Sequence, residues 1–226
     1  MRQMLLDLGA EEPQTLATFE IGHNAELTQL LQRLAQRTAT SLSERFVYLW
    51  GAAGAGKSHL LQALAMYPAT RYIGADADAS AFVFAADVDL YLIDDSEQLS
   101  APLQIEAFNL FNEVREHGAS LVASGTTAPA VLSVREDLRT RFGWGLIYQL
   151  HELTDDEKIA ALTHAAAARG LILSAGVLPY LITHLKRDMR SLSAMLDALD
   201  RYSLETQRPI TLALLRSLLE LEGDGR

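Results

Sequence analysis

The chain contains no cysteine in its 226 residues. Neither a disulfide nor a thiolate metal site can therefore form, which fits a reducing compartment. Basic residues are also scarce, because 19 lysines and arginines stand against 29 aspartates and glutamates, for a net charge of −10. This balance argues against a broad basic surface that would hold nucleic acid by neutralising its phosphates, and leaves room only for a local patch.

Long apolar runs are absent as well. The N-terminal run at residues 4–8 is too short for a signal peptide, and no stretch reaches the length that spans a bilayer. Hydrophobic residues nevertheless make up 49% of the chain. We therefore expect a globular, cytoplasmic protein that has no contact with membranes and is long enough to bury a sizeable core.

Residues 51–58 read GAAGAGKS, a complete G-x-x-x-x-G-K-[ST] phosphate loop. The apolar run 46–50 precedes it as a strand, and residues 60–66 follow it as a helix. Backbone N–H groups and the helix dipole can then converge on phosphate oxygens. The alternative, a flexible glycine-alanine turn, does not account for the strand and helix on either side.

The residues of this loop divide the work of binding a nucleotide. Gly51, Gly54 and Gly56 let the backbone curl around an anion. Lys57 can reach the outer phosphates, and the hydroxyl of Ser58 can ligate Mg²⁺. We therefore expect ADP or ATP together with Mg²⁺ as ligands.

Strands and helices alternate up to about residue 151, which predicts a doubly wound α/β domain with a parallel sheet. From Thr154 onward the pattern is helical only, which predicts a small all-helical lid. We expect a flexible tail at 1–13, a nucleotide-binding domain at 14–151 and a lid domain at 152–226. The expected strands are 46–50, 71–73, 90–93 and 121–123, and the expected helices are 24–36 with Asn24 as its N-cap, 60–66, 105–117, 154–169, 177–185, 192–202 and 212–221.

An acidic pair, Asp94 and Asp95, ends the buried strand 90–93. In a sheet of this type the pair lies beside the phosphate loop. Asp94 can hold Mg²⁺ directly or through water, and Asp95 can orient or activate a water for attack on the γ-phosphate. A strand-end turn is the plainer interpretation, because aspartate is common in turns.

Three further sites carry two interpretations each. Ser124 and Thr126, at the tip of the next strand, could contact the γ-phosphate or could simply form a loop. Arg141, which together with Arg139 precedes Phe-Gly-Trp-Gly, is a candidate arginine finger, although a surface arginine is common. Arg190 could fold back onto the nucleotide phosphates or start a solvated basic helix.

Taken in order and spacing, these motifs resemble the DnaA-type AAA+ ATPase family, and its Hda branch most of all. The resemblance covers roughly residues 14–222 and rests on residues 51–61, 92–95, 138–145 and 189–192. The R-F-G-W-G element is its most family-specific part.

The resemblance implies a role for each matched residue. Asp94 and Asp95 become the Walker B pair, Arg141 the arginine finger and Arg190 the second sensor. His59 falls within the matched phosphate-loop segment and joins the expected nucleotide-binding residues. Two departures stand out, since the loop after residue 123 matches poorly and Asp137 stands where the initiator has a second arginine.

Residues 3–8, QMLLDL, look like the Q-L-x-L-x-L peptide that docks in the hydrophobic pocket of the DNA sliding clamp. The expected anchors are Gln3, Met4, Leu6 and Leu8, with Met4 in place of the usual leucine. A frayed N-terminus is the competing interpretation. The initiator's DNA-binding and helicase-interaction domains are not expected, so the clamp would supply an indirect route to DNA.

The resemblance therefore implies a regulator that stimulates ATP hydrolysis by the initiator DnaA in trans. An autonomous AAA+ ATPase such as a helicase loader, a small-molecule P-loop kinase and a non-catalytic nucleotide-gated adaptor remain alternatives. The sequence leaves open whether the chain forms a homodimer, whether ADP or ATP is the working ligand, and whether its own hydrolysis is active.

Overall fold

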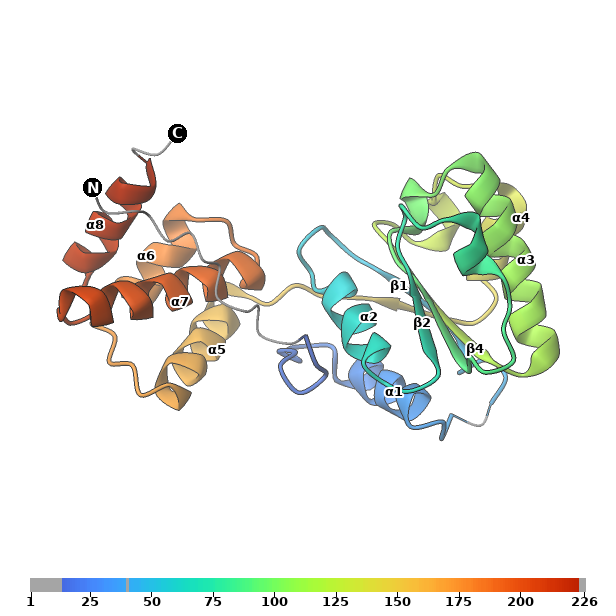
Figure 1. The fold of residues 1–226 in the computed structure, drawn as a ribbon, viewed down its shortest axis with the longest axis horizontal. Helices are drawn as coiled ribbons and strands as arrows, with labels where there is room; N and C mark the ends of the chain where they lie inside the picture. Colours follow the sequence, from blue (N-terminus) through green and yellow to red (C-terminus); the bar gives the residue numbers. More distant parts are fainter. Residues whose placement is uncertain (1–13, 40, 224–226) are drawn as a thin grey trace. The chain divides into compact units, whose positions relative to one another are not determined.

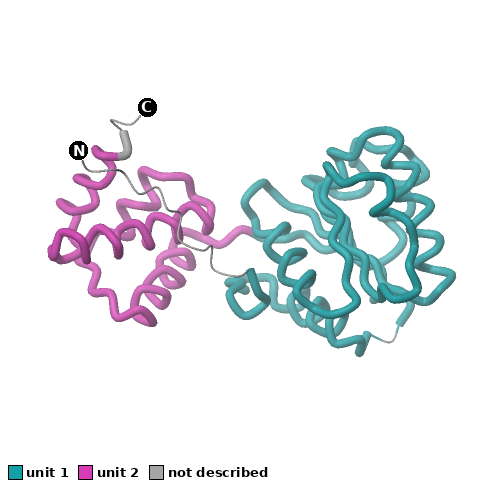
Figure 2. Tube along the Cα trace, viewed as in Figure 1, with its two compact units in different colours: residues 1–151 teal, residues 152–226 magenta. Residues whose placement is uncertain are grey.

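The computed structural model describes residues 14–39 and 41–223. The chain divides into two compact units, Met1–His151 and Glu152–Arg226, shown in teal and magenta in Figure 2. Each unit has a hydrophobic core of its own. The two units are therefore described separately.

A parallel sheet forms the centre of the first unit (Figure 1). Within the described residues the strand order is β2-β3-β4-β1-β5, and every neighbouring pair is parallel. All carboxyl ends of the strands therefore meet at one edge of the sheet. The strands are β1 Phe46–Trp50, β2 Thr70–Ile73, β3 Leu90–Ile93, β4 Ser120–Gly125 and β5 Leu146–Gln149.

Helices cover both faces of this sheet, because alternate residues of each buried strand point to opposite sides. In β1, Val47 and Leu49 pack with leucines of α1 and α2 on one face. Phe46 and Tyr48 pack with apolar residues of α3 and α4 on the other. The expected doubly wound α/β fold is confirmed. The helices are α1 Ala25–Ala35, α2 Lys57–Ala65, α3 Ala101–His117 and α4 Glu136–Phe142, with short 3₁₀ turns at η1 Ala79–Phe82, η2 Ser96–Gln98 and η3 Pro129–Val131.

The sequence pattern did not reveal two of these elements, α4 and β5. Both lie between the polar loop after β4 and residue 151, where we expected no regular structure. Strand β5 pairs with β1 alone, as an edge strand, and none of its residues is fully buried. Such a strand lacks the continuous apolar run that marks β3 and β4.

Asn24 is positioned at the N-cap of α1 as expected, but its side chain does not cap the helix. The amide is buried and instead bonds the backbone of His151, where Nδ2 donates to the carbonyl at 3.0 Å and Oδ1 accepts from the N–H at 2.9 Å. The start of α1 is thereby joined to the last residue of the unit. The expected capping role of Asn24 was wrong because a tertiary partner takes both of its polar atoms.

The second unit is all-helical, as expected for a lid. Thr154 begins its first helix with a capping box, since the Thr154 hydroxyl accepts from the Glu157 N–H and the Glu157 carboxylate accepts from the Thr154 N–H. Apolar side chains of the four helices form one core. In the described part of the chain, none of the helices is both long and apolar enough to cross a membrane. The helices are α5 Asp155–Ala168, α6 Val177–His184, α7 Met189–Thr206 and α8 Leu212–Gly223.

Candidate functional site

The phosphate loop leaves β1 at the carboxyl edge of the sheet and ends where α2 begins at Lys57. Gly54 and Gly56 have φ values of +86° and +102°, a region that favours glycine. A Cβ on Gly51 would lie 2.6 Å from the carbonyl oxygen of Leu150, closer than real Cβ atoms come. The glycines of the motif are therefore required by the fold of the loop itself.

Lys57 is only 6% exposed, and its ammonium lies inside the loop. Its Nζ donates to the carbonyl oxygens of Gly51 at 2.8 Å and of Ala52 at 3.0 Å. No side chain caps the first turn of α2, where the N-cap is Gly56. An ammonium and the free N–H groups of a helix start form a donor set that suits a phosphate group.

A segment before α1 packs against this loop. The sequence pattern did not predict this contact. The ring of Phe19 lies so close to Gly56 that a Cβ there would approach Phe19 Cε2 to 2.9 Å. The ring of His59 lies 5.6 Å from the ring of Phe19, centroid to centroid, and its Nε2 is 3.0 Å from the Thr15 carbonyl oxygen. His59 thus joins the loop to the chain before α1.

Asp94 directly follows β3 at the same edge of the sheet and is 2% exposed. Its Oδ2 accepts a hydrogen bond from the hydroxyl of Tyr72 at 2.7 Å. Its Oδ1 accepts from the hydroxyl of Ser124 and from the N–H of Asp95. Ser124, fully buried within β4, therefore serves to fix Asp94, a role that neither of our two interpretations of Ser124 included.

Asp95 follows in a left-handed conformation with φ of +49°. Its N–H lies 3.1 Å from both Asp94 Oδ1 and Ser124 Oγ. Burial raises the pKa of Asp95, the charges of Asp94 and Glu97 raise it further, and Lys57 lowers it in part. A carboxyl whose pKa is shifted upward beside a phosphate loop is a candidate for proton chemistry.

Few side chains here can ligate a divalent cation, and they do so through oxygen atoms, which are hard ligands. Ser58 is the second residue of α2, and Asp94 is the carboxylate that ends β3. No cluster of three or more potential metal-ligating side chains occurs among the described residues. Mg²⁺ is commonly held by one or two carboxylates together with substrate phosphates and water, so this set fits Mg²⁺ that arrives with a nucleotide.

Arg141 lies near the end of α4, on the face that packs against α3. Its Nε donates to Asn112 Oδ1 at 3.2 Å, and its Cζ is 5.2 Å from the centroid of the Phe108 ring. The sequence pattern marked neither Asn112 nor Phe108. Both residues hold the guanidinium in one orientation.

The Phe-Gly-Trp-Gly element that follows Arg141 joins α4 to the start of β5. The ring of Trp144 contacts the ring of Phe46, the first residue of β1, at 5.4 Å between centroids. A Cβ on Gly145 would clash with the carbonyl oxygen of Phe46. The element therefore lies at the amino edge of the sheet, about 16 Å along the five residues of β1 from the phosphate loop.

The remaining predicted residues fall elsewhere. Arg190 is exposed and is the second residue of α7, in the helical unit, where Asp188 caps the helix by accepting from the Ser191 N–H. The proposed clamp-binding residues Gln3, Met4, Leu6 and Leu8 lie outside the described residues. Thr126 is exposed in the loop after β4.

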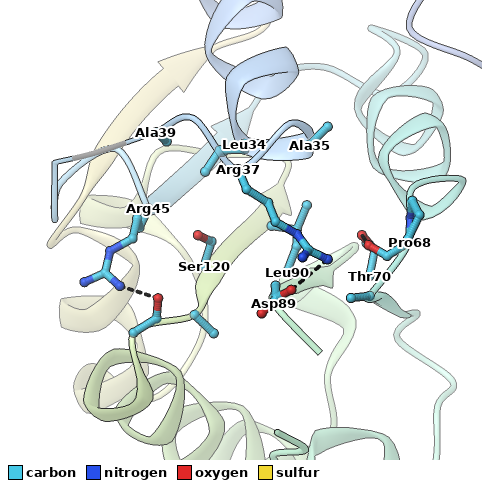
Figure 3. A pocket seen from close by; sticks show the side chains of 13 residues that line it. Leu34, Ala35, Arg37, Ala39, Arg45, Pro68, Thr70, Asp89, Leu90 and Ser120 are labelled. Atoms are coloured by element: carbon cyan, nitrogen blue, oxygen red, sulfur yellow. Dashed lines mark hydrogen bonds and ion pairs between the residues drawn. The ribbon is translucent and has the colours of Figure 1, made fainter. Parts of the chain in front are cut away.

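A cavity of about 160 Å³ lies at the amino edge of the sheet, away from the phosphate loop (Figure 3). Two guanidinium groups border it. Arg37 pairs with Asp89 at 2.7 Å, and Arg45 donates to the carbonyl of Gly118, the C-cap of α3. Arg45 offsets an unpaired carbonyl at the C-terminal end of α3, and Asp89 neutralises Arg37, so both arginines have a structural explanation.

Comparison with known proteins assigns this arrangement to a family. The model for the bacterial DnaA ATPase domain matches residues 75–149, and the model for the Hda lid domain matches residues 155–219. An uncharacterised protein of Haemophilus influenzae is 33% identical over 233 residues, which cover 97% of this chain and 99% of that protein. The chain belongs to the DnaA-type AAA+ family. Its helical unit is an Hda-type lid.

Solved structures share the fold of this DnaA-type chain. Domain III of the replication initiation protein DnaA from Thermotoga maritima has a TM-score of 0.75 at 22% identity, over 94% of this chain and 98% of that one. AMPPCP-bound DnaA from Aquifex aeolicus has a TM-score of 0.69 at 23% identity, over 87% and 68%. A RuvB variant from T. maritima has a TM-score of 0.67 at 15% identity, over 94% and 73%.

Proposed function

We propose that this DnaA-related replication protein is a regulator that stimulates ATP hydrolysis by the initiator DnaA in trans. It binds ADP or ATP with Mg²⁺ in its own phosphate loop and presents Arg141 to ATP held by a neighbouring initiator. A guanidinium at that position stabilises the charge that develops on the transferred phosphoryl group.

The observation that supports this proposal is that Arg141 directly precedes the Phe-Gly-Trp-Gly element, whose Trp144 packs on Phe46 at the opposite end of β1 from the phosphate loop. The guanidinium of Arg141 is held by Asn112 and Phe108 of α3, and neither residue belongs to the phosphate loop. A neighbouring subunit can bring its γ-phosphate to that edge instead. The match to the DnaA ATPase domain makes the initiator the preferred neighbour.

Nucleotide binding by the chain itself follows from the residues of the loop. Lys57 and the first N–H groups of α2 would hold the phosphates, with Ser58 and Asp94 on the Mg²⁺ side. The bound cation would neutralise phosphate charge. We extend the nucleotide-binding set to His59 and to Arg190 of the lid.

Docking completes the proposal. Gln3, Met4, Leu6 and Leu8 would anchor the chain in the pocket of the DNA sliding clamp. An acidic protein would then reach DNA indirectly, through the clamp. We place this activity in the cytoplasm.

An autonomous AAA+ ATPase is the second candidate, and the intact set of Lys57, Asp94 and Asp95 favours it. In that case Arg141 acts between identical subunits and hydrolysis rises with the concentration of this chain alone. A nucleotide-gated adaptor is the third, and would bind nucleotide without changing turnover by the initiator.

The deciding experiment measures ATP hydrolysis by the same organism's initiator with this protein, ADP and DNA-loaded clamp present. Wild type is compared with Arg141→Ala and with Arg139→Ala, a matched control on the same helix. Stimulation by wild type and by the control, with loss of at least about 100-fold in Arg141→Ala, is the expected result for an arginine finger. Equal stimulation by all three, or none with clamp binding confirmed, contradicts the proposal.

A further inference from the structure

The free edge of β5 offers backbone groups to a further strand. Within residues 14–39 and 41–223, β5 pairs with β1 alone. The Leu150 N–H, just past the strand, donates to the Trp50 carbonyl at 2.7 Å. Because every second residue of a strand bonds the same neighbour, Ile147 and Gln149 direct their N–H and carbonyl groups to the open side. Both residues are exposed, so a strand can approach them there.

The chain around this edge lacks the charges and prolines that discourage strand pairing. Residues 142–150 contain neither a charged residue nor a proline, although charged residues make up 21% of the chain. Apolar side chains are exposed here, with Trp144 43% and Ile147 44% exposed. An uncharged, exposed edge strand associates with other strands unless something covers it. The edge of β5 is therefore suited to association.

The opposite edge strand, β2, has the same length as β5 but is protected. Arg71 places a charge on it, and Pro68 lies just before it. The Arg71 guanidinium donates to the Val83 carbonyl at 2.7 Å, which ties the segment after η1 to this strand. The contrast between the two edges indicates that β5 is the one that receives a partner.

We propose that β5 pairs with β5 of a second copy of this chain, antiparallel across a twofold axis. Two copies that each carry a net charge of −10 repel one another unless they meet at a neutral surface. Residues 142–150 provide such a surface. The resulting dimer would form whether or not the chain acts on the initiator.

The charges that flank the strand favour the antiparallel arrangement. Arg139 and Arg141 precede β5, and Glu152 and Asp155 follow it. Antiparallel pairing brings the start of one strand beside the end of the other, and opposite charges then approach each other. Parallel pairing would bring like charges together instead.

The outward-facing residues determine the register of this pairing. With Ile147 of one copy opposite Gln149 of the other, both open residues of each strand exchange N–H and carbonyl bonds. The twofold axis then passes at Tyr148. A strand this short buries little area, so we expect a weak dimer that forms at high protein concentration.

The chain has no cysteine, so an introduced thiol reacts without competition. Ile147→Cys and Gln149→Cys are mixed as full chains and oxidised. In the expected register these positions lie opposite one another at a Cα separation of about 5.5 Å, within the range of a disulfide. Dimers that join the two variants should form at least about tenfold faster than dimers of Val83→Cys. Val83 is the matched control, because it is also exposed and apolar but lies outside β5. Cross-linking no faster than in this control overturns the inference.

Sedimentation of the full chain measures the association itself. Ile147→Lys puts a charge on the open edge, and Ile147→Pro removes an N–H that does not take part in the pairing of β5 with β1. Both changes should raise the dissociation constant of the dimer at least about tenfold, with thermal melting close to that of the wild type. Val83→Lys should leave the dissociation constant unchanged.

Two results of this measurement contradict the dimer. A wild type that stays monomeric at about 100 µM overturns the inference and leaves the edge to a strand from a different protein. A dimer that a folded Ile147→Lys does not weaken overturns it as well, because the copies then meet at another surface.

Discussion

Arg141 and Asn112 form a hydrogen bond across two packed helices, with Nε of the arginine donating to Oδ1 of the amide at 3.2 Å. Because this bond engages Nε, the two terminal nitrogens remain as the pair of donors that suits a phosphate. We predict that Asn112→Ala lowers stimulation of the initiator's hydrolysis about tenfold, the equivalent of roughly 1.4 kcal/mol. Asn112→Asp, which keeps the acceptor, should retain most of the stimulation.

Thermal melting and ADP affinity serve as controls for this variant, since Asn112 lies away from the phosphate loop. Both should match wild type. Full stimulation by Asn112→Ala would show that the orientation of Arg141 does not depend on this bond.

Gly56 carries two constraints, a φ of +102° and contact with Phe19, whereas Gly170 has a φ of +70° and no atoms near its would-be Cβ. We predict that Gly170→Ala costs only the left-handed strain, about 1–2 kcal/mol. Gly56→Ala adds the clash with the Phe19 ring and should cost more, with loss of ADP binding. Urea unfolding of the two variants side by side measures the difference. Equal losses of unfolding free energy in the two variants would mean that the Phe19 ring moves aside at little cost.

Asn24 should be more important to stability than a helix cap, because both polar atoms of its amide bond the His151 backbone. We predict that Asn24→Ala lowers the free energy of unfolding of the first unit by about 1–3 kcal/mol, as two part-buried groups of the His151 backbone lose their partners. Asn24→Ser introduces a hydroxyl that can cap α1, but this hydroxyl cannot bond both the N–H and the carbonyl of His151. If the serine variant recovers full stability in chemical denaturation, capping is the more important role after all.

Asp95 destabilises the fold when it is ionised, since burial and the charges of Asp94 and Glu97 raise its pKa. With the folded pKa above the unfolded one, the penalty is present at neutral pH. It disappears as the pH falls through the raised folded pKa toward the ordinary value near 3.8. We predict that Asp95→Asn melts at a higher temperature than wild type at pH 7, with a gap that closes by about pH 4.

The melting curves also separate this effect from backbone strain. Asparagine tolerates the left-handed conformation of residue 95, and that gain would not depend on pH. A gap of constant size from pH 7 to pH 4 would therefore assign the difference to the backbone and not to the charge.

The sequence predicted an element correctly where a short, local pattern of residues encodes it. The run 90–93 is buried on both faces and reads as a strand, and the spacing of the phosphate loop determines its own conformation. Strand β5 was missed because its residues alternate between half-buried and exposed at a sheet edge. Tyr72, Asn112 and Phe19 were missed for a different reason, because their partners lie far along the chain and no short motif records them.

The Phe-Gly-Trp-Gly element after Arg141 and the phosphate loop lie at opposite edges of the sheet, which makes the first unit directional. Contacts that join one edge of a subunit to the other edge of its neighbour are head-to-tail, and they build open rows unless the rotation closes a ring. A chain with this arrangement can extend such a row only in one sense. On the proposed function, one copy of this chain adds to one end of a row of initiators and acts on the terminal subunit, while the other end stays free to grow.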